Sequence, residues 1–423
     1  MMNYYELIKK KKAGKEALVI EDASYTYGEL VKMADSLAEK WSAENRNPCG
    51  RGKICPIVHV IMEKDILMQL VSFFACYVIG EIPLIVPYDS NSFENGQRID
   101  DMTVPENVCM AVSTSGTTGE PKIYFRTYES WAGYFPIQNE IFMVKESSRL
   151  FMQGSLAFTG NLNLYMAQFY AGATVIAENI FSPKRWADTI KRQKADSIYL
   201  IPSKLLLLPK VIKEEIAEVQ MIISGSQSMG KKEAEELKCS FPNTHILLYY
   251  AASELNYVTY VTDENMTEER NLIGKPFPKV EVFLQDGEIY VNTEYHVEGV
   301  HCPCSLSDSA YQDEEGNFYF NGRKDDILLI RGRKVSALKI ENILEQLPQV
   351  KEAAVTEEKK GKESYLVAYI VLQEEKEYQK QGVYGILRQF LAHYEMPRRI
   401  YPIKKLPRNE SGKVDKQRLN MIY

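Results

Sequence analysis

Ser113-Thr-Ser-Gly-Thr-Thr-Gly-Glu-Pro-Lys122 separates an apolar run at 108–112 from a β-prone run at 123–125. Five of its ten residues are Ser or Thr, two are Gly and one is Lys. Backbone amides, hydroxyls and one ammonium can therefore converge on a polyanion, although a flexible hairpin turn has a similar composition. A Walker A loop is disfavoured, because the two glycines are too close together and a proline precedes the lysine.

The composition is that of a globular protein of two or three domains. The chain has 423 residues and a formal net charge of −6, with both signs mixed, so nucleic-acid binding is not expected. Its first residues run into four lysines at 9–12 without an apolar segment, which favours a cytoplasmic location over secretion. Residues 150–177 lack charge but contain Asn, Gln and Gly, so we expect a buried segment that lines a pocket, and no membrane span.

The seven cysteines are scattered, and only His301-Cys302-Pro303-Cys304 forms a cluster. A structural zinc site needs a second Cys or His pair at metal-ligand spacing, and none accompanies this cluster. We therefore expect reduced, unpaired thiols.

The hydrophobic pattern predicts an α/β fold. Apolar strands alternate with amphipathic helices over the first 250 residues, which is typical of parallel sheets covered by helices. From residue 280 to 320 short alternating strands predict a small β-rich subdomain, and beyond 322 the pattern predicts a separate α+β unit. The predicted helices are 26–41, 66–79, 128–142, 183–193, 231–238, 339–347 and 383–393.

Four further motifs follow the hydroxyl-rich segment in order. They are Gly225-Ser226-Gln227, Tyr250-Ala-Ala-Ser-Glu254, Ser307-Asp308 with Gly322-Arg-Lys-Asp-Asp326, and the segment 406–416 that contains Lys413. Together with the first segment they resemble, over about three hundred residues, the signature motifs of the adenylate-forming superfamily. That superfamily includes acyl-CoA synthetases, aryl-acid ligases and the adenylation domains of peptide synthetases.

The resemblance implies a role for each motif. The first segment would hold the β- and γ-phosphates of ATP, Glu254 and Thr117 would hold Mg²⁺, Asp308 and Arg323 would bind the ribose, and Lys413 would be catalytic. Asp326 would be the hinge between an N-terminal domain, 1–322, and a mobile lid domain, 327–423, with the hinge segment at 323–326. The implied nucleotide-binding residues are Ser113, Thr114, Ser115, Gly116, Thr117, Thr118, Gly119, Lys122, Gly225, Ser226, Tyr250, Ala251, Ser253, Asp308 and Arg323.

The implied reaction is ATP-dependent formation of an acyl-adenylate, followed by transfer to a thiol. Relatives that activate amino acids place an Asp just after the segment around Phe158, and this neighbourhood has no acid. Phe158, Thr159 and Asn163 could instead line a pocket for an aromatic hydroxy acid. We therefore expect an aryl-acid ligase that loads a separate carrier protein, as in siderophore or related secondary-metabolite pathways.

Two alternatives stay open. A fatty-acid or other acyl-CoA synthetase would use CoA as the acceptor. A protein of another class, a non-catalytic nucleotide-binding regulator, is disfavoured because Lys122, Glu254, Asp308, Arg323 and Lys413 are all present.

Overall fold

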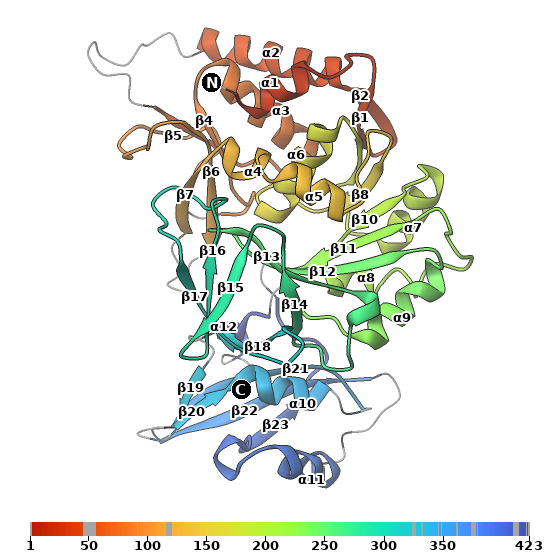
Figure 1. Ribbon diagram of the computed structural model, residues 1–423, viewed down its shortest axis with the longest axis vertical. Coiled ribbons are helices and arrows are strands. Elements are labelled where there is room, and N and C mark those ends of the chain that lie inside the picture. The colour runs from red at the N-terminus through yellow and green to blue at the C-terminus, as the bar shows by residue number, and fades with distance from the viewer. Residues whose placement is uncertain are drawn as a thin grey trace.

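The computed structural model describes residues 2–44, 56–90, 92–115, 121–323, 327–330, 333–345, 347, 349–360, 363–373, 378, 380–408, 414–419 and 421. Two large sheets form most of the molecule, with helices between and around them, and a three-stranded sheet and a two-stranded ribbon lie toward the C-terminus (Figure 1). The predicted α/β class is confirmed.

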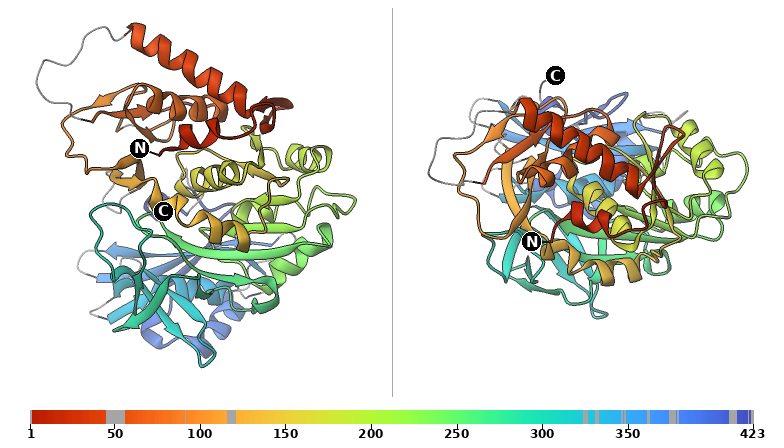
Figure 2. Two further views of the ribbon diagram at one scale, coloured as in Figure 1. Left: turned by 45° about the horizontal axis from the view of Figure 1, so that its top comes forward. Right: turned by 90° about the horizontal axis from the view of Figure 1, so that it is seen from above.

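The N-terminal segment supplies two strands at one edge of the thirteen-stranded sheet and two helices that pack against α3 (Ile66–Val78). It consists of α1 (Tyr4–Lys9), β1 (Glu16–Ile20), β2 (Ala23–Thr26) and α2 (Tyr27–Glu44). Helix α2 begins as predicted, because Thr26 and Glu29 cap it reciprocally. The Glu29 N–H donates to Thr26 Oγ1 at 3.2 Å, and the Thr26 N–H donates to Glu29 Oε2 at 2.7 Å. Helix α2 then contacts α3, as the left view of Figure 2 shows.

The five-stranded sheet has the order β5-β3-β4-β6-β7. Its strands are β3 (Val58–Ile61), β4 (Ile82–Ile85), β5 (Arg98–Ile99), β6 (Val108–Ser115) and β7 (Pro121–Thr127). Strands β3, β4 and β6 run parallel, whereas β6 and β7 form an antiparallel hairpin with Thr114 opposite Lys122. The hydroxyl-rich segment therefore connects two paired strands.

The thirteen-stranded sheet changes character along its length. Its order is β15-β16-β17-β18-β14-β13-β12-β11-β10-β8-β9-β1-β2. The ladders from β1 through β12 are parallel, and those from β12 to β15 are antiparallel. The predicted β-rich unit is thus hydrogen-bonded to the parallel sheet through β13 and β14. The bounds are β8 (Arg149–Gln153), β9 (Thr174–Glu178), β10 (Ser197–Tyr199), β11 (Met221–Gly225), β12 (His245–Ala252), β13 (Asn256–Thr262), β14 (Leu272–Pro276), β15 (Glu281–Gln285), β16 (Glu288–Asn292), β17 (Cys304–Gln312) and β18 (Phe318–Arg323).

Helices cover both faces of the parallel part. Successive residues of β8 point to opposite faces, so Leu150 and Met152 join the core with α3 and α6, while Phe151 packs with α7 and α9. The uncharged window, predicted as a buried segment, forms β8, the buried helix α6 and β9. The helices of this part are α6 (Thr159–Ala171), α7 (Pro183–Arg192), α8 (Pro202–Leu205), α9 (Lys231–Ser240) and the 3₁₀ turn η1 (Asp263–Asn265). No helix in the described ranges combines the length and hydropathy needed to cross a bilayer.

One predicted helix is wrong in its extent. Residues 128–142 form two short helices, α4 (Glu129–Ala132) and α5 (Phe135–Ile141), separated at Gly133 and Tyr134. Pro136 explains the break, because it has no N–H to donate to the carbonyl of residue 132 in a continuous helix.

The C-terminal part has a core of its own, at the lower end of the molecule in Figure 1. It contains β19 (Ile327–Ile330), β20 (Arg333–Ser336), α10 (Ala337–Glu345), β21 (Val350–Lys360), β22 (Glu363–Leu372), α11 (Lys380–Phe390), the 3₁₀ turn η3 (His393–Glu395), β23 (Arg399–Pro402) and α12 (Lys416–Leu419). Arg270 contacts Glu345 at 2.6 Å, which ties this part to the rest of the described chain. The boundaries predicted at 322 and 327 stay predictions.

Candidate active site

Four of the predicted nucleotide-binding residues lie at or near the carboxyl edge of the parallel strands. Gly225 ends β11, and Tyr250 and Ala251 lie near the end of the neighbouring strand β12. Ser226, just past β11, has a φ of +67°, which indicates a tight turn at this edge. Ligand-binding loops of open α/β sheets lie at such carboxyl edges.

Two predicted nucleotide-binding residues, Tyr250 and Arg323, converge on a third, Asp308. Its strand, β17, pairs with β18 so that Asp308 lies opposite Arg323, and Arg323 Nε is 3.1 Å from Asp308 Oδ1. The Tyr250 hydroxyl donates a hydrogen bond to Asp308 Oδ2. Burial, with the neighbouring Asp308 carboxylate adding, raises the pKa of Tyr250 well above its usual value. The Asp308 side chain is 1% exposed, so its carboxylate is held in a fixed position.

Glu254 lies between the two large sheets. Its carboxylate lies near the Tyr124 hydroxyl of β7, and its charge adds to burial in raising the pKa of Tyr124. The Val297 N–H donates to the Glu254 carbonyl at 2.8 Å, and the Glu298 N–H donates to the Phe125 carbonyl at 2.8 Å. The loop after β16 therefore holds both the Glu254 turn and the strand that follows the hydroxyl-rich segment.

Arg126 was not predicted, and it links the same three segments. Its side chain is fully buried in β7. One terminal nitrogen donates to the Ser253 carbonyl at 2.7 Å, and the other lies 3.3 Å from the Tyr295 carbonyl. Burial lowers the pKa of Arg126 to about 10. An isolated arginine in a strand carries no sequence signal that distinguishes it from a surface residue.

Aromatic side chains fill the space next to the predicted acid pocket. The hydroxyls of Tyr199 and Tyr249 lie 2.9 Å apart, and a methyl group added at Gly225 would lie 2.7 Å from the Tyr249 ring. A methyl group at Gly160 would be 3.0 Å from the Tyr199 hydroxyl. Tyr199 and Tyr249 were not predicted as site residues, although Tyr199 ends β10 and Tyr249 lies in the second half of β12.

The three predicted pocket residues have different environments. Phe158 precedes α6, and Thr159 is its first residue. Asn163, one turn further along, is buried and accepts a hydrogen bond at 2.9 Å from the Tyr257 hydroxyl. The Asn163 side chain therefore supports the aromatic layer, and its role in the acid pocket stays a prediction.

Lys204 adds a partly buried cation at the same edge. Its ammonium donates to the Gln153 side-chain oxygen at 2.6 Å, at the end of β8. Burial lowers the pKa of Lys204 to about 8.

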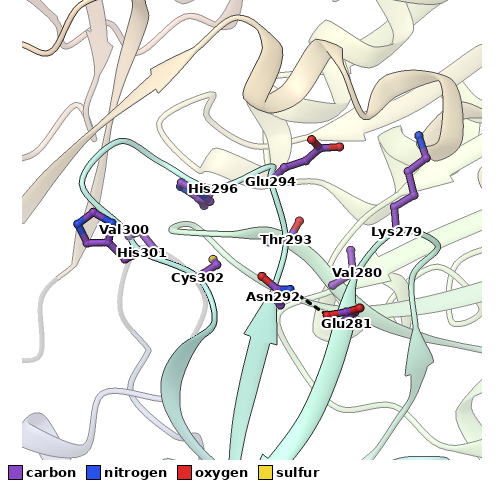
Figure 3. A pocket seen from close by; sticks show the side chains of 10 residues that line it. All are labelled: Lys279, Val280, Glu281, Asn292, Thr293, Glu294, His296, Val300, His301 and Cys302. Atoms are coloured by element: carbon purple, nitrogen blue, oxygen red, sulfur yellow. Dashed lines mark hydrogen bonds between the residues drawn. The ribbon is translucent and has the colours of Figure 1, made fainter.

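A cavity of about 700 Å³ opens beside the loop that holds Glu254. Figure 3 shows the Cys302 sulfur among its lining side chains, together with His296, His301 and Glu294. The Cys302 and Cys304 sulfur atoms are 4.0 Å apart. Burial raises the pKa of the Cys304 thiol to about 12, and the charges of Cys302 and Glu254 add to this rise.

Several predicted residues lie outside the described residues. These are Gly116, Thr117, Thr118 and Gly119 of the first segment, Asp326 and Lys413. Ser113, Thr114 and Ser115 end β6, and Lys122 follows Pro121 in β7 with an exposed side chain. Within the described ranges, Glu254 belongs to no group of three metal-ligating side chains. A Mg²⁺ that takes one carboxylate and completes its shell with phosphate and water fits this donor set.

Residues 85–299 match the sequence family described as AMP-binding enzyme, and residues 339–413 match the AMP-binding enzyme C-terminal domain. A putative long chain fatty acid-CoA ligase, VraA, of Staphylococcus haemolyticus (strain JCSC1435) is 28% identical over 326 residues, 73% of this chain and 69% of the relative. An uncharacterized acyl-CoA ligase, YhfT, of Bacillus subtilis (strain 168) is 24% identical over 332 residues, 74% of this chain and 68% of the relative.

Solved structures share the fold. The o-succinylbenzoate CoA synthetase MenE from Bacillus subtilis, in complex with its acyl-adenylate intermediate, superposes with a TM-score of 0.82 at 19% identity, covering 99% of this chain and 98% of that one. ATP-bound MatB from Rhodopseudomonas palustris superposes with a TM-score of 0.84 at 18% identity, covering 100% and 98%. At these identities the likeness establishes the fold alone.

Proposed function

Because the chain belongs to the family of AMP-binding enzymes, and with it to the adenylate-forming superfamily, we propose that it joins a carboxylic acid to a thiol in two steps. In the first, a carboxylate oxygen attacks the α-phosphorus of ATP, the bond to the leaving pyrophosphate breaks, and an acyl-adenylate forms. In the second, the thiol sulfur attacks the acyl carbon, AMP leaves, and the thiol proton passes to solvent. The first step gives the poor carboxylate a good leaving group.

The observation that carries this proposal is the convergence of Tyr250, Asp308 and Arg323 beside Glu254. A fixed carboxylate can accept both ribose hydroxyls, and a guanidinium next to it can reach ribose or phosphate oxygens. The Glu254 carboxylate lies near the hydroxyl of Tyr124, two residues after Lys122, so the proposed metal ligand is close to the strand that follows the proposed phosphate segment. Mg²⁺, when bound through Glu254 and Thr117, supplies charge neutralisation on the phosphates.

Lys413 is our proposed catalytic residue in the C-terminal part. An ammonium placed between the carboxylate and the α-phosphate would stabilise the charge that develops in the transition state, which is worth roughly 3–4 kcal/mol for a single well-placed donor. We propose that the part from 327 to 423 moves about Asp326 to bring Lys413 to the site.

The acid we favour is aromatic and carries a hydroxyl group. The Tyr199 and Tyr249 hydroxyls, 2.9 Å apart beside Gly225, can exchange hydrogen bonds with such a group, and Phe158 offers an apolar ring next to Gly160. A long-chain fatty acid is the second candidate, favoured by the name of the staphylococcal relative. Both named relatives favour CoA as the acceptor, and a carrier protein is the alternative.

Carboxylate-dependent exchange of pyrophosphate into ATP tests the first step. A panel of benzoates, hydroxybenzoates and fatty acids of increasing length should give exchange with one class above the rest. Replacement of Lys413 by Ala should lower exchange by at least about 100-fold while ATP affinity changes little. Lys405→Ala, at an exposed lysine in the same part of the chain, is the matched control and should exchange at the wild-type rate.

The outcomes separate the candidates. ATP binding without exchange for every acid would contradict the enzyme and favour the nucleotide-binding regulator. Equal exchange in wild type and Lys413→Ala would refute the role of that lysine. Adding CoA or a phosphopantetheinylated carrier protein to the preformed adenylate, and measuring AMP release, identifies the acceptor.

A further inference from the structure

Cys302 and Cys304 are a pair of close thiols next to an open cavity. Their sulfur atoms are 4.0 Å apart. In a disulfide bond the two sulfur atoms would be about 2 Å apart. Both side chains are partly exposed, in contrast to Cys76 and Cys109, which are buried. Cys302 lines the 700 Å³ cavity, so a small polar oxidant can reach it from solvent (Figure 3).

The thiol pair is connected to the candidate site through a short stretch of backbone. The loop that precedes Cys302 contains Val297, whose N–H holds the Glu254 carbonyl at 2.8 Å. On the other side, Cys304 begins β17, the strand that carries Asp308 four residues later. A movement of either sulfur is therefore passed directly to a strand or loop that positions a proposed nucleotide ligand.

The position of Cys304 relative to Glu254 supports the same connection. The Glu254 carboxylate is close enough to contribute to the electrostatic environment of the Cys304 thiol. Cys304 also lies opposite Val291 of β16, so the sheet fixes its backbone. When the disulfide forms, the loop that precedes Cys302 therefore has to move more than the strand does. This loop holds the backbone of the Glu254 turn.

We propose that Cys302 and Cys304 form a reversible disulfide when the protein meets a peroxide, and that this bond displaces the Glu254 turn and weakens binding of MgATP. The second half rests on the proposed function, whereas formation of the bond does not.

The chemistry balances with hydrogen peroxide as the oxidant. The Cys302 thiol loses its proton, the thiolate attacks one peroxide oxygen, and the O–O bond breaks to give a sulfenic acid and hydroxide, which takes up the released proton as water. The Cys304 sulfur then attacks the Cys302 sulfur, an S–S bond forms, and hydroxide leaves with the thiol proton as a second water. Two thiols and one peroxide thus give one disulfide and two waters, and a dithiol reductant reverses the change.

Trypsin gives a direct test, because it cuts after Lys279 and Arg323 and after no residue between them. The resulting peptide contains Cys302 and Cys304 as its only cysteines. The folded, full-length protein is treated with hydrogen peroxide, its remaining thiols are alkylated, and the digest is analysed by mass spectrometry. We expect this peptide to lose about 2 Da and to resist alkylation until dithiothreitol is added.

Affinity for ATP, measured with Mg²⁺ and again with EDTA, tests the coupling without any acid substrate. Peroxide should weaken Mg²⁺-dependent ATP binding about tenfold. A displacement of about 1 Å at a site costs on the order of 100-fold in rate, and we expect a smaller displacement of the Glu254 turn to cost less. Cys302→Ser and Cys304→Ser should each bind MgATP normally and lose the peroxide effect. Cys239→Ser, at an exposed cysteine on α9, is the matched control and should keep it.

Each other outcome overturns part of the proposal. A peptide that gains oxygen, or that is fully alkylated after peroxide, refutes the disulfide. A disulfide that leaves MgATP affinity unchanged refutes the coupling, and so does an equal loss of affinity in Cys302→Ser. Absence of acid-dependent exchange would contradict the proposed enzyme function. The mass of the tryptic peptide and the affinity for MgATP would still decide on the disulfide and on its coupling to the site.

Discussion

Replacement of Gly225 by Ala should distort the aromatic wall at the carboxyl edge of the sheet. The new methyl group would lie 2.7 Å from Cε2 and Cζ of Tyr249, whereas carbon atoms in contact are about 3.5–4.0 Å apart. The ring would have to move by about 1 Å. It is held by the Tyr199 hydroxyl at 2.9 Å and by an edge-to-face contact with the Tyr257 ring, with centroids 4.9 Å apart.

The magnitude follows from these contacts. Overpacking in a core costs about 1–3 kcal/mol. Breaking the Tyr199–Tyr249 hydrogen bond adds about 1 kcal/mol, so we expect a loss of about 2–4 kcal/mol in the free energy of unfolding. The assay is urea unfolding of the variant and the wild type, and the exchange assay should show a raised KM for the acid.

Two further variants make this prediction refutable. Gly14→Ala is the matched control, because a methyl group there meets nothing within 4 Å, and its unfolding midpoint should stay at the wild-type value. Tyr249→Ala removes the ring that the methyl group would strike. Gly225→Ala should therefore cost less in the Tyr249→Ala background than alone. A loss below about 0.5 kcal/mol for Gly225→Ala, or an equal loss in both backgrounds, would refute the steric argument.

Three other perturbations test the remaining contacts. Asp308→Asn removes the charge that Arg323 Nε approaches at 3.1 Å, and we expect the KM for ATP in the exchange assay to rise about 10-fold to 100-fold with the KM for the acid unchanged. Arg126→Met leaves two backbone carbonyls without donors, so the free energy of unfolding in urea should fall by about 2–5 kcal/mol; an unchanged midpoint would contradict this. Burial lowers the pKa of Lys204 from 10.5 to about 8, so between these values the unfolded chain binds more protons than the folded one. The stability of the wild type relative to Lys204→Met should therefore rise as the pH increases from 8 to 10.5, and a constant difference would count against a buried ammonium.

The sequence predicted those parts of the site that depend on local chemistry. The order of motifs identified the superfamily, and the pattern of apolar strands and turns predicted Gly225 and Tyr250 near the ends of their strands. These features are readable because each rests on neighbouring residues: a hairpin turn, a strand that ends in a turn, a reciprocal helix cap at Thr26 and Glu29. The interrupted helix at 128–142 could also have been predicted, since Pro136 is visible in the sequence.

Features that depend on distant residues were not predicted. Tyr199 and Tyr249 lie fifty positions apart, and only the pairing of β10, β11 and β12 brings their hydroxyls together. The continuity of the β-rich unit with the parallel sheet likewise depends on the β13 and β14 ladders. A thiol pair with one intervening residue was visible, but its relation to Glu254 required the loop at 297.

The buried Arg126 shows how the two sheets can set the geometry of one site. A guanidinium removed from water costs several kcal/mol, and the lowered pKa reflects that cost. Two carbonyl acceptors and the face of Trp131, 5.2 Å from the guanidinium carbon, offset part of it. An apolar residue here would leave both carbonyls without donors, so the guanidinium and the two loops stabilise one another. What the arginine alone provides is a fixed distance between β7, which follows the proposed phosphate segment, and the Ser253 carbonyl next to the proposed metal ligand. If the phosphate segment and the metal ligand both hold the phosphates, the distance between β7 and the Ser253 carbonyl has to stay constant. The planar guanidinium, with its donors in a fixed geometry, keeps that distance better than a flexible side chain would.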